Sequence, residues 1–294
     1  MFGFLNINKP SGISSHKVIS VLRKVTGIKQ IGHAGTLDPL ASGVLPVAIG
    51  KASKLIDYMP EDKAYSVSMV FGKVSDTFDL EGHIEEFSNK KVTLEEIENA
   101  LLNFRGKIDQ IPPAFSAVHY NGKRLYELAR EGKIPDDIPK RVITVYKNEI
   151  ISFDYEQQIL KLEIECSKGT YIRSIVNDLG QLLGTGAVMT ELIRTKSSGL
   201  DINSSLALDE SLNKEVIKQS LINPISILNM PVVEVSEVDF EKIKNGNKFK
   251  KIINLEGDIL LVKNDKILAI AISDSNYIQP KKVLLWGVFL YYCF

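Results

Sequence analysis

Alternating apolar and polar residues predict short strands in the first 70 residues. Residues 2–8 and 64–71 alternate, and the apolar run 44–49 is typical of a buried strand. Between the first two of these, residues 14–27 show apolar side chains at helical spacing behind a serine cap and before a glycine. Strands and a helix therefore interleave from the start of the chain.

The middle of the chain continues this mixture. A Thr-Leu-Glu-Glu capping box predicts a helix over 93–104, and residues 119–133 are expected to form a short polar helix on a loop, anchored by Tyr126 and Leu128. Strands are expected over 141–153 and 158–166, followed by a helix from about 171 to 183.

The pattern changes around Pro224 and Pro231, which bracket a linker-like stretch. Beyond it, short strands and one short helix have the spacing of a small β-rich module. They are expected at 231–235, 258–263 and 266–272, with the helix near 237–245. The absence of a regular strand–helix–strand rhythm favours an α+β protein with a large domain over 1–229 and a small one over 230–294. The apolar ending 286–294 is too short to cross a membrane and suggests no function.

Composition narrows the class of protein. The 294 residues are 44% hydrophobic and 24% charged, which excludes a disordered chain, a collagen-like fibre and a disulfide scaffold. With 36 basic and 36 acidic side chains the net charge is zero, so the surface is not basic throughout. The charge is uneven, however: two basic blocks, 1–59 and 105–147, flank the acidic block 74–104. Such blocks either solvate outer faces or give a positive surface for a polyanion.

Cofactor motifs are not apparent. Cys166 and Cys293 fit no metal or disulfide spacing, the four histidines are scattered, and the acidic cluster at 76–81 misses the spacing of a calcium loop. The amino terminus shows no secretion signal. We therefore expect a cytoplasmic protein that uses neither a cofactor nor a metal and does not bind a membrane.

The segment 32–46 is the strongest candidate for chemistry. Three glycines and two prolines predict a rigid, tightly turned loop in which Pro39 holds Asp38 in an extended conformation. Gly35 and Gly43 would permit turns or the close approach of another chain. A carboxylate on such a loop can act as a nucleophile or stabilise charge at a sugar carbon. It can equally serve a turn by bonding nearby amides, and spacing alone leaves both interpretations open.

The loop sequence GHAGTLDPLASGVLP closely resembles the catalytic motif of the TruB family of tRNA pseudouridine synthases, with Asp38 at the family's essential aspartate. Further segments agree in order over about residues 3–230, and the β-rich end looks like the PUA module often appended in this family. The matching segments are NKPSG at 8–12, KAY at 63–65, PPAFSA at 112–117, SKGTYIR at 167–173 and LIR at 192–194.

This resemblance implies a pseudouridine-synthase fold with a mixed, mainly antiparallel sheet flanked by helices. It also implies isomerisation of uridine to pseudouridine by base flipping. Asp38 would act at C1′, Arg173 would pair with it, and Tyr65 would stack on the uracil and accept a proton. Tyr171 and Leu192 would line the pocket. Without the resemblance, these four partners of Asp38 also fit packing roles or a surface ion pair.

The resemblance further implies how RNA is held. His33 would fill the gap left by the flipped base, and Lys9 would support the pocket floor and bind substrate. A thumb-like insert over about 119–141 would grip RNA through its basic side chains. These are Lys123, Arg124, Arg130 and Arg141, with Lys133 and Lys140 in the same block. The expected partner is the T-stem loop of tRNA, at the position numbered 55 in tRNA, bound by a monomer with no obligatory protein partner.

Two other functions stay open at this point. One is an RNA-binding module that acts as a tRNA-folding chaperone and does not need its chemistry. The other is a guide-RNA-dependent relative that modifies ribosomal RNA within a multi-protein particle. The intact set of Asp38, Tyr65 and Arg173 favours an enzyme over the first, and the compact length with a thumb-like insert favours independent action over the second.

Overall fold

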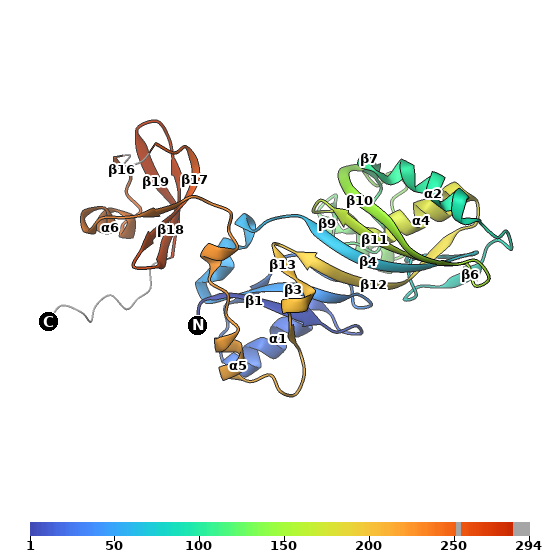
Figure 1. Ribbon diagram of the computed structural model, residues 1–294, viewed down its shortest axis with the longest axis horizontal. Coiled ribbons are helices and arrows are strands. Elements are labelled where there is room, and N and C mark those ends of the chain that lie inside the picture. The colour runs from blue at the N-terminus through green and yellow to red at the C-terminus, as the bar shows by residue number, and fades with distance from the viewer. Residues whose placement is uncertain (251–253, 285–294) are drawn as a thin grey trace.

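The computed structural model describes residues 1–250 and 254–284 (Figure 1). The apolar ending 286–294 lies outside the described residues. The described residues form a ten-stranded sheet, a five-stranded sheet, two small two-stranded sheets and several helices, and the expected α+β class is confirmed. No helix in the described part of the chain is both long and apolar enough to span a membrane.

The large sheet runs in the order β14-β1-β3-β12-β4-β11-β10-β7, with β2 paired to β3 and β13 to β12. Its neighbours are antiparallel except β1 with β14 and β3 with β12, which are parallel. The strands are β1 (Gly3–Lys9), β2 (Ile31–His33), β3 (Ser42–Ile49), β4 (Lys63–Phe71), β7 (Gly106–Gln110), β10 (Arg141–Asp154), β11 (Ile159–Cys166), β12 (Ala187–Ser197), β13 (Leu200–Asp201) and β14 (Leu206–Ala207).

Helices begin and end where the sequence provides caps. Ser14 accepts a hydrogen bond from the Lys17 amide at the start of α1, and Gly27 ends that helix in a left-handed conformation. The expected capping box opens α2 at Thr93. The helices are α1 (Ser15–Thr26), α2 (Leu94–Leu101), α3 (Leu125–Arg130), α4 (Ile172–Leu183) and α5 (Lys214–Gln219), with 3₁₀ turns at η1 (Gly50–Tyr58), η2 (Leu102–Phe104), η3 (Ile202–Ser204) and η4 (Pro224–Ser226).

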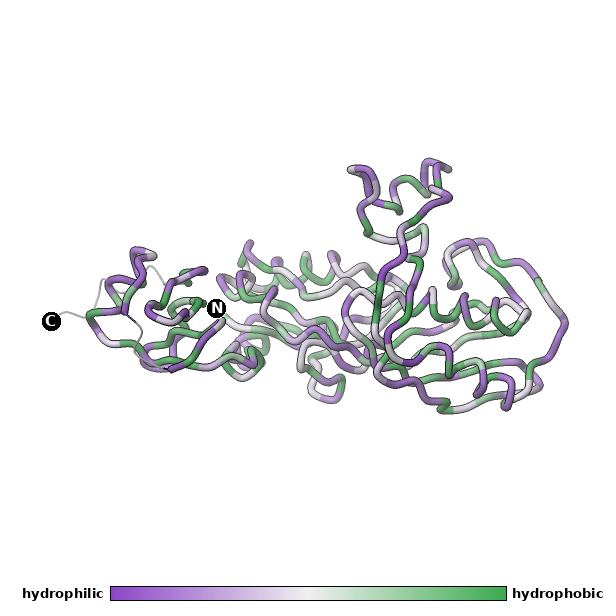
Figure 2. The backbone as a smooth tube through the Cα atoms, turned by 90° about the horizontal axis from the view of Figure 1, so that it is seen from above, coloured by the Kyte–Doolittle hydropathy of each residue, from purple (hydrophilic) through white to green (hydrophobic). Residues whose placement is uncertain are grey.

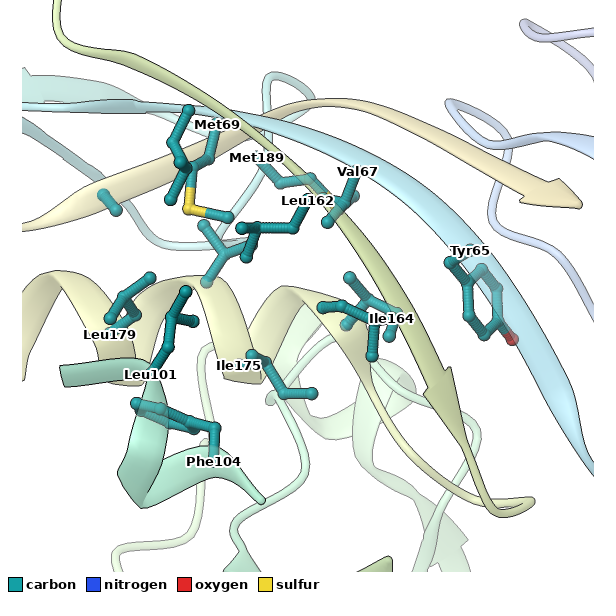
Figure 3. Close-up of a cluster of buried hydrophobic side chains, with 14 of the residues drawn as sticks. Tyr65, Val67, Met69, Leu101, Phe104, Leu162, Ile164, Ile175, Leu179 and Met189 are labelled. Atoms are coloured by element: carbon teal, nitrogen blue, oxygen red, sulfur yellow. The ribbon is translucent and has the colours of Figure 1, made fainter. Parts of the chain in front are cut away.

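The core beside the site lies between α4 and the strands β4, β11 and β12. Alternate residues of β4 point to this face, so Tyr65, Val67 and Met69 are buried against Ile175 and Leu179 of the helix (Figure 3). Tyr65 lies at one end of this apolar row, with its hydroxyl group directed away from the aliphatic side chains. The packing therefore holds an aromatic ring where the core meets the cleft.

Strand β12 was not expected from the hydrophobic pattern, although it lies at the centre of the sheet. Its pairing with β4 shifts register twice, between Met189 and Glu191 and between Arg194 and Lys196. Each bulge displaces the two-residue alternation by which strands are recognised in a sequence. The strand carries Leu192 and Arg194 to the site.

The insert between β7 and β10 also differs from expectation. Residues 119–133 do not form one helix: they contain the hairpin of β8 (His119–Tyr120) and β9 (Lys123–Arg124), followed by the short helix α3. Leu125, at 1% exposure, is the buried anchor, whereas Tyr126 and Leu128 are only partly buried. In Figure 1 this segment recedes from the viewer, and Figure 2, turned by 90°, shows an arm projecting at the corresponding place. A second small hairpin pairs β5 (Lys73–Ser75) with β6 (Ile84–Glu86).

The small sheet runs in the order β15-β17-β18-β19-β16. It packs against η1 through an apolar cluster that includes Leu55 and Leu260. Lys282 reinforces this contact, because its amine lies 2.7 Å from a carboxylate oxygen of Asp57 and above the ring of Tyr58. The elements of this small C-terminal module are β15 (Val232–Glu234), α6 (Glu237–Lys244), β16 (Phe249–Lys250), β17 (Gly257–Lys263), β18 (Lys266–Ser273) and β19 (Tyr277–Val283).

Candidate active site

The Asp38 loop, residues 34–41, is held rigidly between β2 and β3. Ser15 of α1 bonds both the amide and the carbonyl group of Leu37, at 2.8 and 3.0 Å. The Ala34 amide donates to the Pro46 carbonyl, and the Ala41 amide to that of Asp38. Because these bonds satisfy backbone groups on both sides of Asp38, its position does not depend on a bound substrate.

Two glycines let this loop approach its neighbours closely. Gly43 has φ +101°, and a Cβ atom there would lie 2.3 Å from the Arg194 carbonyl oxygen of β12. Gly35 has φ +82°, and its missing Cβ leaves room for the Arg194 guanidinium. Both the backbone conformation and the space therefore require glycine, as the sequence indicated.

Arg173 joins the loop to the rest of the site. It lies in the first turn of α4, and its Nε atom is 3.0 Å from Oδ2 of Asp38. Its two other nitrogens donate to the carbonyls of Thr77 and Phe115, each at 3.0 Å. Arg173 is only 5% exposed, so the pair is not the weak surface contact that spacing alone permitted. The Asp38 side chain, 36% exposed, remains accessible from the cleft.

A second carboxylate, which the sequence reasoning missed, shares Arg173. Oδ2 of Asp79 lies 3.5 Å from Nε of Arg173, and Asp79 is buried. Its other oxygen accepts hydrogen bonds from the Thr77 hydroxyl at 2.6 Å and the Glu81 amide at 3.0 Å. The signal in the sequence is the acidic cluster at 76–81, whose spacing does not fit a calcium loop. Asp79 instead balances the buried guanidinium and fixes its orientation.

Tyr65 lies on β4 at the cleft, 6% exposed, beside the equally buried Leu192 of β12. Burial raises the pKa of the Tyr65 phenol, and the Arg194 guanidinium, which interacts with its hydroxyl group, acts in the opposite direction. The phenol is therefore protonated near neutral pH. Ring and leucine together form an apolar surface for a flat base.

Arg194 is a further residue whose role the sequence did not suggest. It is fully buried and donates to the carbonyls of Val44 at 2.7 Å and Gly35 at 3.0 Å. These bonds connect β12 to the start of the Asp38 loop and to β3, which follows the loop. Arg194 therefore supports the loop through its backbone carbonyls.

His33 and Tyr171 both line the cleft. Burial and the nearby Arg194 lower the pKa of His33, and its Nδ1 atom has no hydrogen-bond partner in the described structure. Tyr171 caps α4, where its backbone amide and carbonyl exchange two hydrogen bonds with the side chain of Gln110. The histidine is therefore neutral near pH 7, and the tyrosine sits on a fixed backbone.

Lys9 lies beneath the loop rather than in the cleft. It is fully buried, and its amine donates to the carbonyls of Pro10, Ile13 and Pro39 at 2.9, 2.7 and 3.2 Å. All three donors of the amine are used within the chain, and Lys9 is not among the residues that line the cleft. Lys9 fastens the turn after β1 to the Asp38 loop, and burial lowers its pKa to about 8.

Of the four basic residues expected to bind RNA, only Arg124 is among the described residues that line the cleft. Arg124 lines the cleft together with Tyr126, whereas Arg130 lies 5.6 Å from the centre of the Tyr126 ring. The amine of Lys123 is 3.1 Å from Glu131, so it is engaged within the insert. Arg141 is exposed at the start of β10, outside the cleft lining.

The cleft has a volume of about 660 Å³ and gathers residues from segments far apart in sequence. Asp38, Tyr65 and Arg173 meet there with Arg124 and Tyr126 of the insert. A carboxylate paired with a buried arginine, beside an apolar aromatic floor, suits attack at an electrophilic sugar carbon while a base rests on the floor.

Comparison with known proteins agrees with this arrangement. Residues 23–172 match the model of the TruB family pseudouridylate synthase N-terminal domain, and residues 173–224 match the tRNA pseudouridylate synthase B C-terminal domain. The chain belongs to the TruB family. The tRNA pseudouridine synthase B of Lactobacillus johnsonii is 42% identical over 96% of this chain and 98% of its own length. That of Gloeothece citriformis is 50% identical over 71% of this chain and 68% of its own length.

Solved structures show the same fold. A Cbf5-Nop10-Gar1 complex contains a chain with TM-score 0.71 and 22% identity, covering 96% of this TruB-family chain and 84% of that one. An H/ACA RNP bound to a substrate RNA containing 2′-deoxyuridine gives TM-score 0.70 at 21% identity, with 97% and 85% coverage. The expected pseudouridine-synthase fold with a small C-terminal β-rich module is confirmed.

Proposed function

We propose that this protein converts a uridine of tRNA into pseudouridine. The observation that carries the proposal is the ion pair between Asp38 and the buried Arg173 at a cleft floored by Tyr65 and Leu192. Family membership and relatives named tRNA pseudouridine synthase B support the same reaction. We take residues 1–229 as the catalytic domain and 230–294 as a PUA-like RNA-binding domain.

The proposed reaction is an isomerisation that needs no external oxidant. The bond between N1 and C1′ breaks, the uracil turns, and C5 bonds to C1′; the C5 proton then leaves while N1 gains one. Asp38 attacks C1′ or stabilises its positive charge, and Arg173 aims the carboxylate. Tyr65 supports the base, and its phenol oxygen takes up the C5 proton as its own proton passes to solvent, so that the hydroxyl group is protonated before and after the step. Both the covalent and the elimination route begin from this geometry.

The substrate we propose is the T-stem loop of tRNA, with the target at position 55. A uridine in a structured loop must leave its stack to meet Asp38, which costs a few kcal/mol. His33, which is neutral and partly buried and lines the cleft, occupies the gap that the base leaves in this proposal. Arg124 faces the cleft from the insert, while Lys123, Arg130 and Arg141 contribute positive charge around it. Leu192 and Tyr171 complete the pocket.

The test uses pure protein, an unmodified tRNA transcript and an isolated T-arm stem-loop. We expect pseudouridine at one uridine of the T loop in both RNAs, mapped by mass spectrometry, without added protein or cofactor. A control RNA with cytidine at that position should stay unmodified. Product only in the presence of a guide RNA or a second protein would overturn the proposal of a monomer acting alone in the cytoplasm.

A further inference from the structure

Lys63 lines the cleft, although the proposed reaction assigns it no role. It begins β4, two residues before Tyr65, and is partly buried. It also borders a second cavity, lined in part by Tyr146 and Lys196. A Cβ atom added to Gly35 would lie 3.3 Å from its amine, so the amine packs against the Asp38 loop. Lys63 therefore sits where the two cavities meet.

The amine of Lys63 has no hydrogen bond or ion pair with any described residue. The carboxylates nearest the reaction are engaged elsewhere: Asp38 and Asp79 pair with Arg173. Glu61, which acts weakly on Lys63, is bonded to Lys168. Asp38, Asp79 and Glu61 are thus committed to other cations. Asp62, Glu165 and Asp201, which line the second cavity together with Lys63, form no ion pair with it in the described part of the chain.

The other neighbours of Lys63 do not neutralise it. Arg194 carries the same charge, and together with burial it lowers the pKa of Lys63. Burial raises the pKa of the Cys166 thiol to about 11, so that group is neutral. A partly buried ammonium beside a guanidinium is costly unless an anion joins it. RNA, the substrate class proposed above, carries such an anion in each phosphodiester group.

We propose that Lys63 binds the phosphodiester group adjoining the flipped uridine. The inference rests on the proposed function, because it takes the bound RNA to supply the missing anion. A lysine amine binds phosphate as a point charge and reads no base, so its role is to position the target nucleotide over Tyr65 and beside Asp38.

The experiment measures binding of T-arm stem-loops to proteins carrying Asp38→Asn, so that no reaction occurs. In two of the RNAs a neutral methylphosphonate replaces the phosphate on either the 5′ or the 3′ side of the target uridine. Lys63→Met is compared with Lys63→Arg, which keeps the charge. Lys196→Met is the matched control, because Lys196 borders the second cavity but not the cleft.

Lys63→Met should weaken binding of the ordinary RNA by about tenfold. The slope of log affinity against log salt should fall by about 0.7, the value for one phosphate contact on a single strand. With one of the two methylphosphonate RNAs, Lys63→Met should cause no further loss. Lys63→Arg should retain most of the affinity, and thermal melting checks that each variant folds.

An equal loss on all three RNAs, or no loss on the ordinary RNA, would overturn the inference. So would the same coupling with Lys196→Met, since it would place the phosphate in the second cavity. These failures are distinct from failure of the proposed function. If the protein with Asp38 intact produces pseudouridine while Lys63→Met leaves binding unchanged, only the role of Lys63 is wrong.

Discussion

Two regions of the site, the cleft floor and the projecting insert, place their charged side chains in opposite ways. The floor comprises Tyr65 and Leu192 together with the buried side chains of Lys9, Asp79, Arg173 and Arg194. In the floor, Arg173 and Arg194 are buried and use backbone carbonyls and carboxylates as partners. In the insert, the ion pair of Lys123 with Glu131 leaves the two side chains 53% and 41% exposed. Buried charge pairs are costly to break, whereas exposed ones contribute little to stability.

This difference corresponds to two functions, catalysis in the floor and RNA binding by the insert. A carboxylate that meets a sugar carbon must be placed within a fraction of an ångström, and a buried network of fixed carbonyls provides that placement. A surface that follows an RNA backbone needs charge more than geometry, so exposed lysines and arginines suffice. Substitutions in the floor should therefore affect rate, and those in the insert should affect affinity.

The largest effect is expected for Arg173→Met. It leaves Asp79 buried without its cation, which should lower the free energy of unfolding by about 3–5 kcal/mol. It also releases Asp38, which should reduce the single-turnover rate by about 10³-fold. Chemical denaturation and rapid-quench kinetics measure the two effects. An unchanged rate in a folded protein would show that the floor does not position Asp38.

Asp79→Asn should have the next largest effect. The amide still accepts the bonds from Thr77 and Glu81 but no longer balances Arg173, so we expect a rate about 10²-fold lower. Asp76→Asn is the matched control, because Asp76 is exposed and, among the described residues, its carboxylate accepts a hydrogen bond only from the His83 amide. Single-turnover rates of the two variants should differ clearly; equal rates would remove Asp79 from the positioning network.

Lys9 should make the stability of the protein depend on pH. Burial lowers its pKa from 10.5 to about 8, so between these values the unfolded chain binds more protons than the folded one. Stability should therefore rise with pH across this window through Lys9. Urea denaturation from pH 7.5 to 10.5 should show that this contribution is missing in Lys9→Met. A difference between the two proteins that stays constant with pH would contradict the lowered pKa.

The smallest effect is expected in the insert. Lys123→Met removes an exposed ion pair, so the free energy of unfolding should change by less than about 0.5 kcal/mol. RNA affinity should fall by no more than about tenfold, equally for RNAs of different loop sequence. Denaturation and binding titrations suffice. A large loss of the saturated rate would show that the insert takes part in the chemistry.

The sequence predicted what depends on local chemistry. The turned Asp38 loop follows from its glycines and prolines, and α1 and α2 follow from their caps. Strand β12 was not predicted, because two bulges break the alternation of its apolar and polar residues. The role of the Asp79 carboxylate and the contacts of Lys9 with backbone carbonyls were not predicted. Both depend on which segments meet in space, and the spacing of residues along the sequence does not reveal this. The pairing of Asp38 with Arg173 came from family resemblance, not from the pattern of residues.

The most direct test of the account compares the wild-type protein with Asp38→Asn on an unmodified tRNA transcript, at enzyme concentrations that saturate the RNA. Binding should differ by less than about threefold, because Asp38 is accessible and the floor keeps its other bonds. Mass mapping should find pseudouridine in the T loop with wild-type protein and none with Asp38→Asn. Pseudouridine formed by Asp38→Asn at the wild-type rate would contradict the central claim that this carboxylate carries the reaction.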